Sequence, residues 1–451
     1  MKKEVAIGII AALLAALLGT MTVTVHPLAP IVIILAFGIA AFFTSSPYTL
    51  LLGFILVLFT RPAEFFPQLS VLQMGKLASL SALGFFFASK VIRQDLSWAK
   101  SRVNIPMIAL TVCVFLSSRL GSDPTASTAT FTDVFVKILI LYILIVNLID
   151  TPAKVSGFML TIMGACSFLG IYGLQAQIMG TATIEGSRAA LVGYLGDPND
   201  MAMTLLMAAP CALQGAATTR GKTRVFFVFL ALILVGGILS TQSRGGLLGI
   251  AGGSFFVLRD RVRSNLVIGA ILGTMLLGGV AAAGISDRAS GGSNHGEAGI
   301  DESAQGRLDA WAAGGRMVMA KPLLGVGFSR FGDNYERYVI NPVIWGKHET
   351  HNAYIKCAAE TGLLGFGSFM SLLLMGLWGA WRVREVIGPD DPSLRAALAR
   401  GLFCNMVAVG ISAFFLSACW SWFIYILVAQ AVVHERIYVT AASQEEEGVS
   451  P

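Results

Sequence analysis

Charged side chains are scarce in this sequence. They make up 13% of the 451 residues, whereas about 25% is usual in a soluble domain. Hydrophobic residues account for 55%, and the mean hydropathy is +0.73. These values exclude an ordinary soluble protein and predict a single polytopic membrane domain built from helices.

Paired cysteines and basic runs with interleaved aromatics are also lacking. The six cysteines form no C-x-x-C pair and lie in or beside apolar segments. We therefore expect small core residues, not disulfides or metal ligands. The formal net charge of +6 indicates no nucleic-acid partner, because a bias of Lys and Arg toward the inner loops of a membrane protein accounts for it.

Apolar runs, in contrast, fill most of the chain. They lie at about 5–25, 28–43, 48–60, 77–92, 104–118, 132–149, 156–179, 201–217, 225–241, 246–258, 265–285, 353–381, 398–416 and 419–434. About 20 residues span a bilayer as a helix, so the chain predicts an all-α fold with about 12–14 transmembrane helices. The predicted parts are helices with short loops over 1–285, one large periplasmic loop over 286–352, C-terminal helices over 353–436 and a cytoplasmic tail over 437–451.

Two compact cationic loops, at 220–224 and 259–263, predict the orientation of the chain. Cytoplasmic loops carry the excess of Lys and Arg in membrane proteins. With these loops inside, Arg188, Arg244, Arg307 and His351 all fall at the outer surface. We therefore expect a multi-pass protein of the inner-membrane type with a site that faces the outer side.

Arg244 is the first candidate for function. The apolar run after it, from Leu247 to Leu258, gives only about 18 Å of helix, against a hydrocarbon core of about 30 Å. Arg244 is therefore expected below the outer surface and inside the protein, where an arginine is functional by default. Gly245 and Gly246 would keep the turn tight and let a ligand approach. The alternative is an arginine that snorkels from a helix end.

The longest polar interval of the chain, from about Ser286 to Asn352, contains a second candidate, Arg307. The sequence from Arg307 to Met319 predicts an amphipathic helix that Arg307 opens, with Leu308, Trp311, Ala312 and Met319 on one side. Such a helix would lie on the outer leaflet or cap a cavity. On the alternative interpretation, Arg307 belongs only to a solvated face.

Arg188 precedes the run Gly196-Asp197-Pro198-Asn199-Asp200. The two carboxylates could suggest a metal site, but no third carboxylate or histidine accompanies them at ligand spacing. We expect a turn and a helix cap there. No metal and no cofactor are predicted.

His351 lies where a membrane helix is predicted to begin, with Thr350 or Asn352 as the N-cap. A helix N-terminus disfavours imidazolium, and a neutral imidazole beside an anion site suits a general base. The alternative is a histidine that caps or packs. His348, three residues earlier, has no acidic or cysteine partner at metal-ligand spacing.

Several arginines and one histidine, facing outward at membrane depth, suit a lipid pyrophosphate that carries a sugar. Arginine makes bidentate contacts to phosphate oxygens and stays charged. Its charge would help the pyrophosphate to leave without a metal, while the histidine takes a proton from the attacking hydroxyl.

Four pieces of sequence resemble the O-antigen ligase and polymerase family of bacterial envelope glycosyltransferases. They are Gly196-Asp197-Pro198-Asn199; Ser243-Arg244-Gly245-Gly246; Gly306-Arg307 with Pro322-Leu323-Leu324-Gly325-Val326-Gly327; and His351-Asn352 with Glu360-Thr361-Gly362-Leu363-Leu364-Gly365. The resemblance implies a GT-C-like, inverting, metal-independent enzyme whose donor is an undecaprenyl-pyrophosphate-linked glycan. It also implies that Arg244 and Arg307, and less directly Arg188, bind the pyrophosphate, and that His351 is the base.

Two acceptors remain open. A ligase would transfer the glycan to lipid A core oligosaccharide, and this is the interpretation we prefer. A polymerase would transfer it to a second lipid-linked repeat unit. A polyprenyl-phosphate or anion transporter is a third possibility, but it would predict arginines at mid-membrane or on both faces and pseudo-symmetric halves, and neither is evident.

Overall fold

The computed structural model describes residues 46–65, 69, 73–95, 97–181, 183–184, 188–190, 196–282, 302–340, 342 and 346–440. The predicted apolar segments at 5–25 and 28–43 lie outside these residues. So do the start of the predicted polar interval and most of the predicted tail.

Every apolar segment predicted between 48 and 434 is occupied by a helix. The first part of the chain forms α3 (Pro47–Thr60), α4 (Pro62–Phe65), α5 (Met74–Ile92), α6 (Asn104–Leu120), α7 (Pro124–Thr130), the π-helix η2 (Phe131–Phe135), α8 (Val136–Leu148) and α9 (Pro152–Met179). The middle part forms β1 (Thr183–Ile184), β2 (Arg188–Ala189), α10 (Pro198–Leu206), α11 (Ala209–Thr218), α12 (Gly221–Ser240), α13 (Arg244–Arg259) and α14 (Asn265–Ala282). The last part forms α16 (Glu302–Ala320), α17 (Phe331–Tyr338), α18 (Ala353–Val386), α19 (Leu394–Ala413), the 3-10 helix η4 (Ala418–Trp420), α20 (Trp422–His434) and the π-helix η5 (Glu435–Val439).

Among the described residues, nine helical stretches are long and apolar enough to cross a membrane. The strands β1 and β2 form a single antiparallel pair, with Thr183 opposite Ala189. The predicted fold class, an all-α polytopic membrane protein, is therefore confirmed.

Several of these helices begin at a polar cap that the sequence supplies. Thr151, Asp197, Ser243 and Ser393 each accept a hydrogen bond from a backbone N–H in the first turn of the helix that follows. The first helical residue after Thr151 and after Asp197 is a proline. Both features satisfy or remove backbone donors that a helix start leaves unpaired.

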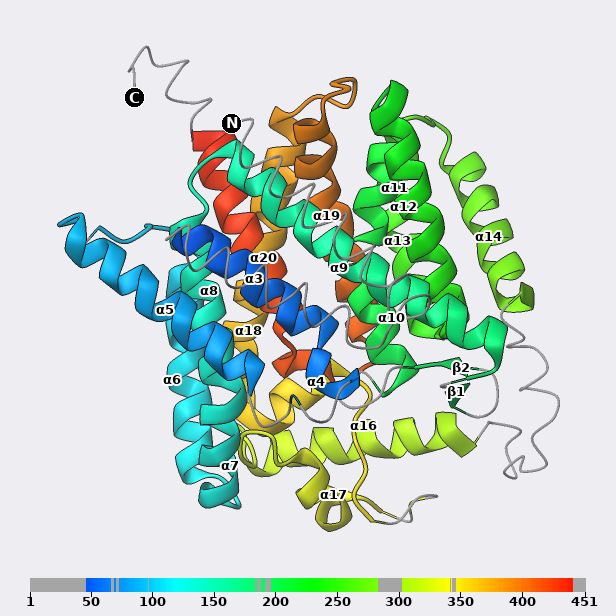
Figure 1. The fold of residues 1–451 in the computed structure, drawn as a ribbon. Coiled ribbons are helices and arrows are strands. Elements are labelled where there is room, and N and C mark those ends of the chain that lie inside the picture. The colour runs from blue at the N-terminus through cyan, green and yellow to red at the C-terminus, as the bar shows by residue number, and fades with distance from the viewer. Residues whose placement is uncertain are drawn as a thin grey trace.

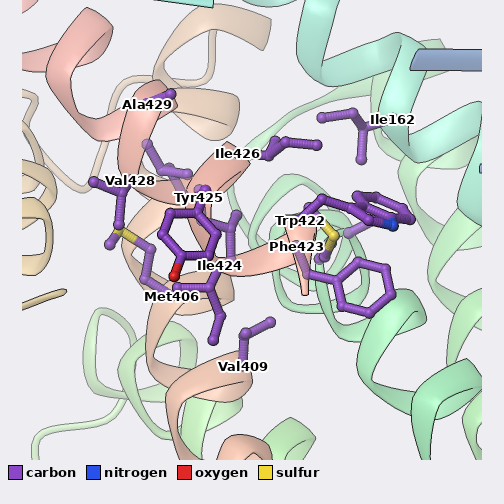
Figure 2. Packing of buried hydrophobic residues seen from close by; sticks show 14 of the residues in the cluster. Ile162, Met406, Val409, Trp422, Phe423, Ile424, Tyr425, Ile426, Val428 and Ala429 are labelled. Carbon is purple, nitrogen blue, oxygen red and sulfur yellow. The ribbon is translucent and has the colours of Figure 1, made fainter. Parts of the chain in front are cut away.

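Helix α20 is the centre of the core. All of its residues, from Trp422 to His434, are buried, as expected of a helix that is apolar on every side. Figure 2 shows Met406 and Val409 of α19 and Ile162 of α9 around it. The core therefore joins elements from both halves of the chain.

The two ends of the helix bundle differ in character (Figure 1). Helices α16 and α17 lie across one end, and the connections α11–α12, α13–α14 and α18–α19 lie at the other. At this second end Arg261 pairs with Asp390, N–O 3.2 Å. Asp260, nearby in the chain, bridges the buried guanidinium groups of Arg384 and Arg400, both at 2.7 Å. The cationic loops and the polar interval thus lie at opposite ends of the molecule.

Helix α16 differs from its prediction at its start. It begins at Glu302, so Arg307 lies in its second turn and does not open it. Ala310, Ala313 and Met317 are fully buried, because small residues allow close contact with α18: a Cβ on Gly314 would lie 2.5 Å from Ile355 Cγ2.

The predicted apolar side of α16 faces away from that contact. Leu308 is 46% and Met319 is 74% exposed, and Ala312 is exposed as well. Trp311 is half-buried, and its Nε1 donates a hydrogen bond to the carbonyl of Thr350.

Candidate functional site

His351 occupies a strained position immediately before α18. Asn352 is the N-cap of this helix, and its Oδ1 accepts from the backbone nitrogens of Tyr354 at 3.0 Å and Ile355 at 3.1 Å. His351 itself has φ +47°, in the left-handed region. A non-glycine residue there costs about 1–3 kcal/mol and persists only where its surroundings over-determine it.

Two other parts of the chain supply that constraint. The backbone N–H of His351 donates to Ser417 Oγ at 2.9 Å, and Ser417 Oγ also lies 3.1 Å from Thr350 Oγ1. Trp311 Nε1 of α16 donates to the carbonyl of Thr350 at 2.9 Å. Helix α16 and the segment between α19 and α20 therefore fix the backbone that carries the imidazole.

The surroundings of the His351 imidazole favour its neutral form. Burial lowers its pKa from the usual value, and the positive charge of Arg307 lowers it further, while Asp197 opposes both effects. The lowered pKa was predicted, but the main cause is burial rather than the helix N-terminus. Burial likewise lowers the pKa of His348, whose ring lies 5.8 Å from that of His351.

A cavity of about 310 Å³ opens beside His351. It is lined by Thr130, Val134, Asp197, Asp200, Phe328, Ser329, Glu349, His351, Lys356, Leu416, Ser417, Trp420 and Ser421. Three of these residues are carboxylates, and Lys356 Nζ pairs with Glu349 Oε2 at 2.6 Å. The cavity therefore places an imidazole beside charged and hydrogen-bonding groups that can orient a hydroxyl.

Arg188 ties together the starts of α10 and α13. Its Nε donates to the carbonyl of Thr241 and its Nη2 to Asn199 Oδ1, both at 3.2 Å. Ser243 Oγ donates to the same Asn199 oxygen at 2.7 Å. This guanidinium thus has a structural role, whatever it binds in addition.

Arg244 was expected inside the protein, and this prediction is wrong. Arg244 is the first residue of α13 and its side chain is exposed. The helix starts earlier than the apolar run because Ser243 Oγ caps it by accepting from Gly246 N at 3.1 Å. The capped helix has 16 residues, or roughly 24 Å, so it brings Arg244 to the end of the bundle.

The glycines after Arg244 pack helices together. A Cβ on Gly245 would lie 3.1 Å from Phe415 Cβ, and one on Gly246 would lie 2.8 Å from Ala202 Cβ. Close approach of neighbouring protein segments therefore explains this pair, in place of the predicted approach of a ligand.

The four predicted site residues, Arg188, Arg244, Arg307 and His351, lie toward one end of the bundle in two groups. Arg307 is half-buried and close enough to His351 to affect its pKa. Arg188 and Arg244 flank the starts of α10 and α13. Asp197 connects the groups: its Oδ1 caps α10 by accepting from Asn199 N at 2.8 Å, as predicted, and it also lines the His351 cavity.

Two charged residues of α18 were missed from the sequence. Lys356 lines the cavity and Glu360 is fully buried. A signal existed, because a Lys and a Glu one turn apart inside an apolar membrane segment are costly and mark a site by default.

Glu360 fixes the loop between α16 and α17. Its carboxylate accepts from the backbone nitrogens of Ser329 and Phe331, each at 3.0 Å, and from Trp420 Nε1 at 2.6 Å. Its carbonyl accepts from Ser117 Oγ at 2.6 Å. This one residue therefore positions two residues of the cavity lining, Ser329 and Trp420.

The glycine motifs at 322–327 and 360–365 interlock around Glu360. Gly325 and Gly362 have φ of +69° and +67°. A Cβ on Gly325 would lie 2.3 Å from the Glu360 carbonyl carbon, and one on Gly362 would lie 2.3 Å from that of Leu323. Leu363 N also donates to the Pro322 carbonyl at 2.7 Å. These motifs build the scaffold of the cavity.

Together, the helices and this cavity define a polytopic membrane protein with a site of charged and hydrogen-bonding residues at one end of its bundle. The sequence model of the O-antigen ligase family matches residues 229–370, and it confirms the resemblance to that family. The matched region includes Arg244, Arg307 and His351 but not Arg188. A search of curated proteins finds no match to the chain.

Proposed function

We propose that this protein is an inverting, metal-independent glycosyltransferase that acts at the periplasmic face of the bacterial inner membrane. Its donor is a glycan linked to undecaprenyl pyrophosphate, and its acceptor is a hydroxyl of lipid A core oligosaccharide. The observation that supports this proposal best is His351, which lines the cavity and whose pKa is lowered by burial and by Arg307.

In the proposed reaction, the acceptor oxygen attacks the anomeric carbon of the donor glycan. The new C–O bond forms as the bond to the pyrophosphate oxygen breaks, and the configuration inverts. His351 takes the proton of the acceptor hydroxyl. Arg244 and Arg307, with Arg188 at the edge of the site, stabilise the negative charge on the departing undecaprenyl pyrophosphate.

The family match is compatible with ligation and with polymerisation, and ligation is the reaction we prefer. A polymerase would use a second lipid-linked repeat unit as acceptor and the same groups for the chemistry. A transfer assay with purified protein distinguishes the two reactions if each acceptor, lipid A core oligosaccharide or the second lipid-linked repeat unit, is supplied separately.

The orientation can be tested by cysteine labelling in intact cells. Lys222 at the start of α12 and Glu336 in α17 are exposed residues at opposite ends of the bundle. We expect a membrane-impermeant maleimide to label Glu336→Cys from the periplasm and Lys222→Cys only after the cells are opened. Labelling of both cysteines in intact cells would contradict the proposed orientation and with it the periplasmic site.

The role of Arg244 can be tested by comparing two substitutions in a transfer assay that contains EDTA. Because Arg244 is exposed, neither change should unfold the protein. Arg244→Lys is expected to lose nearly as much activity as Arg244→Ala, since lysine is a point charge and cannot make the bidentate contact to phosphate oxygens.

Arg259, exposed at the opposite end of α13, provides the control. Arg259→Lys should transfer glycan like the wild type. If Arg244→Lys keeps most activity, Arg244 acts only through its net charge. If EDTA abolishes transfer by the wild-type protein, the metal-independent mechanism is wrong.

A further inference from the structure

A second, mainly apolar groove opens next to the His351 cavity. It has a volume of about 380 Å³ and lies between α3, α4, the start of α5 and α8. Val57 of α3, Leu141 of α8 and Trp422 belong to its apolar lining. The groove and the His351 cavity share two wall residues, Val134 and Trp420. A ligand in the groove therefore ends where the reaction is proposed to occur.

Lys137 gives this groove a positive charge within an apolar wall. Lys137 is the second residue of α8. It lies inside the apolar stretch Pro124–Leu148 and is half-buried. Its ammonium group has no hydrogen bond or ion pair with any residue that the structure describes. A cation at such a place is costly and marks a ligand path by default.

The other charges of the groove leave this cation available. Arg61 and Glu64 pair with each other, Nε–Oε1 2.5 Å. Asp133 and Lys76 also line the groove, but both are exposed. An apolar channel with a half-buried ammonium group suits an amphiphile that carries a phosphate at its polar end.

The helix at the junction is irregular. Residues Phe131–Phe135 form the π-helix η2 between α7 and α8, and they contribute Asp133 to the groove and Val134 to both the groove and the cavity. Insertions of this kind within α-helices occur frequently at functional sites. Here the π-helix carries Val134, one of the two residues that line both spaces.

We propose that this groove binds the acceptor as a phosphate-bearing lipid, with its apolar chains along α3 and α8 and its phosphate on Lys137. The inference rests on the proposed function and adds an acceptor site to it. Arg188 and Arg244 lie beside α10 and α13, whereas the groove meets the cavity at η2 and Trp420. The donor and the acceptor thus approach His351 from different walls.

Direct binding tests this assignment separately from catalysis. Trp420 and Trp422 line the groove, so quenching of tryptophan fluorescence can report the binding of lipid to the protein in nanodiscs. The probes are bis-phosphorylated lipid A core, the same lipid after enzymatic removal of its phosphates, and the undecaprenyl-pyrophosphate-linked glycan.

We expect the wild-type protein to bind the phosphorylated acceptor lipid about tenfold more tightly than the dephosphorylated one, the size of one charge-assisted hydrogen bond. Lys137→Gln should remove this difference and leave donor binding unchanged. Lys137→Arg should restore it. Arg119→Gln is the matched control, because it removes one exposed cation from the end of the neighbouring α6, outside the groove.

Two results would overturn the proposal. In one, Lys137→Gln binds both acceptor lipids like the wild type. In the other, it weakens the donor and not the acceptor, which would make the groove a donor site. If lipid binding depends on Lys137 as expected but the wild-type protein transfers no glycan, the groove is supported as a lipid site and the proposed reaction fails.

Discussion

Replacing His351 with alanine is expected to slow glycan transfer by about 10²- to 10⁴-fold, the usual contribution of a general base. Binding of the lipid-linked donor should remain close to that of the wild type, since arginines and not the imidazole are proposed to hold the pyrophosphate. The measurements are a single-turnover rate at saturating substrates and a donor affinity, both in nanodiscs. His348→Ala is the control, and it should change either quantity little, because His348 lies outside the lining of the cavity.

The pH dependence adds a readout that a purely structural histidine would not affect. Burial and Arg307 lower the pKa of His351, so the base stays neutral on acidification to below the ordinary pKa of histidine. The rate should therefore be level near pH 7 and fall only at lower pH. Removing the Arg307 charge in Arg307→Gln should raise the pKa of His351 and move this fall toward neutral pH.

Several results would contradict the assignment of His351 as the general base. Normal turnover by His351→Ala would be one such result. Loss of donor binding as complete as in Arg307→Gln would be another, because it would make His351 a pyrophosphate ligand. An acid limb that does not move in Arg307→Gln would show that another group controls the rate.

Replacing Glu360 with alanine is expected to cost about 3 kcal/mol or more of stability, because it leaves three donors, two of them buried, without their acceptor. These donors are the backbone nitrogens of Ser329 and Phe331 and the indole nitrogen of Trp420. The loop between α16 and α17 should loosen, and activity should fall with it. Thermal unfolding in detergent, followed by circular dichroism, measures the loss.

Glu385 offers a matched control on the same helix. It is exposed, so Glu385→Ala should change stability by no more than about 0.5 kcal/mol. Glu360→Gln should lie between the two, since the amide keeps the size of the side chain and one acceptor oxygen. If Glu360→Ala unfolds at the temperature of the wild type, the carboxylate does not hold the loop.

The positions of the helices could be predicted from the sequence because their signals are local. Apolar runs of sufficient length and polar caps such as Asp197 and Ser243 act within one turn or one segment. The separation of cationic loops from the polar interval also follows from the order of segments along the chain. Asn352 was one of two residues expected to cap α18, and it is the cap.

Other expectations failed because they depended on contacts between distant segments. Whether Arg244 is buried depends on what packs around the start of α13, and Gly245 and Gly246 face Phe415 and Ala202 instead of a ligand. The low pKa of His351 arises chiefly from burial by surrounding segments, a quantity that no local pattern supplies.

By itself, the sequence determined a helical membrane protein, the caps of its helices and the small set of arginines and histidines from which a site could be chosen. The tertiary structure alone decided how these residues meet. Glu360 and Ser117 are 243 positions apart, and the glycine motifs at 322–327 and 360–365 contact each other only because α18 bends at Gly362. Such contacts depend on the shapes of both partners at once, and therefore on the folded arrangement rather than on either segment alone.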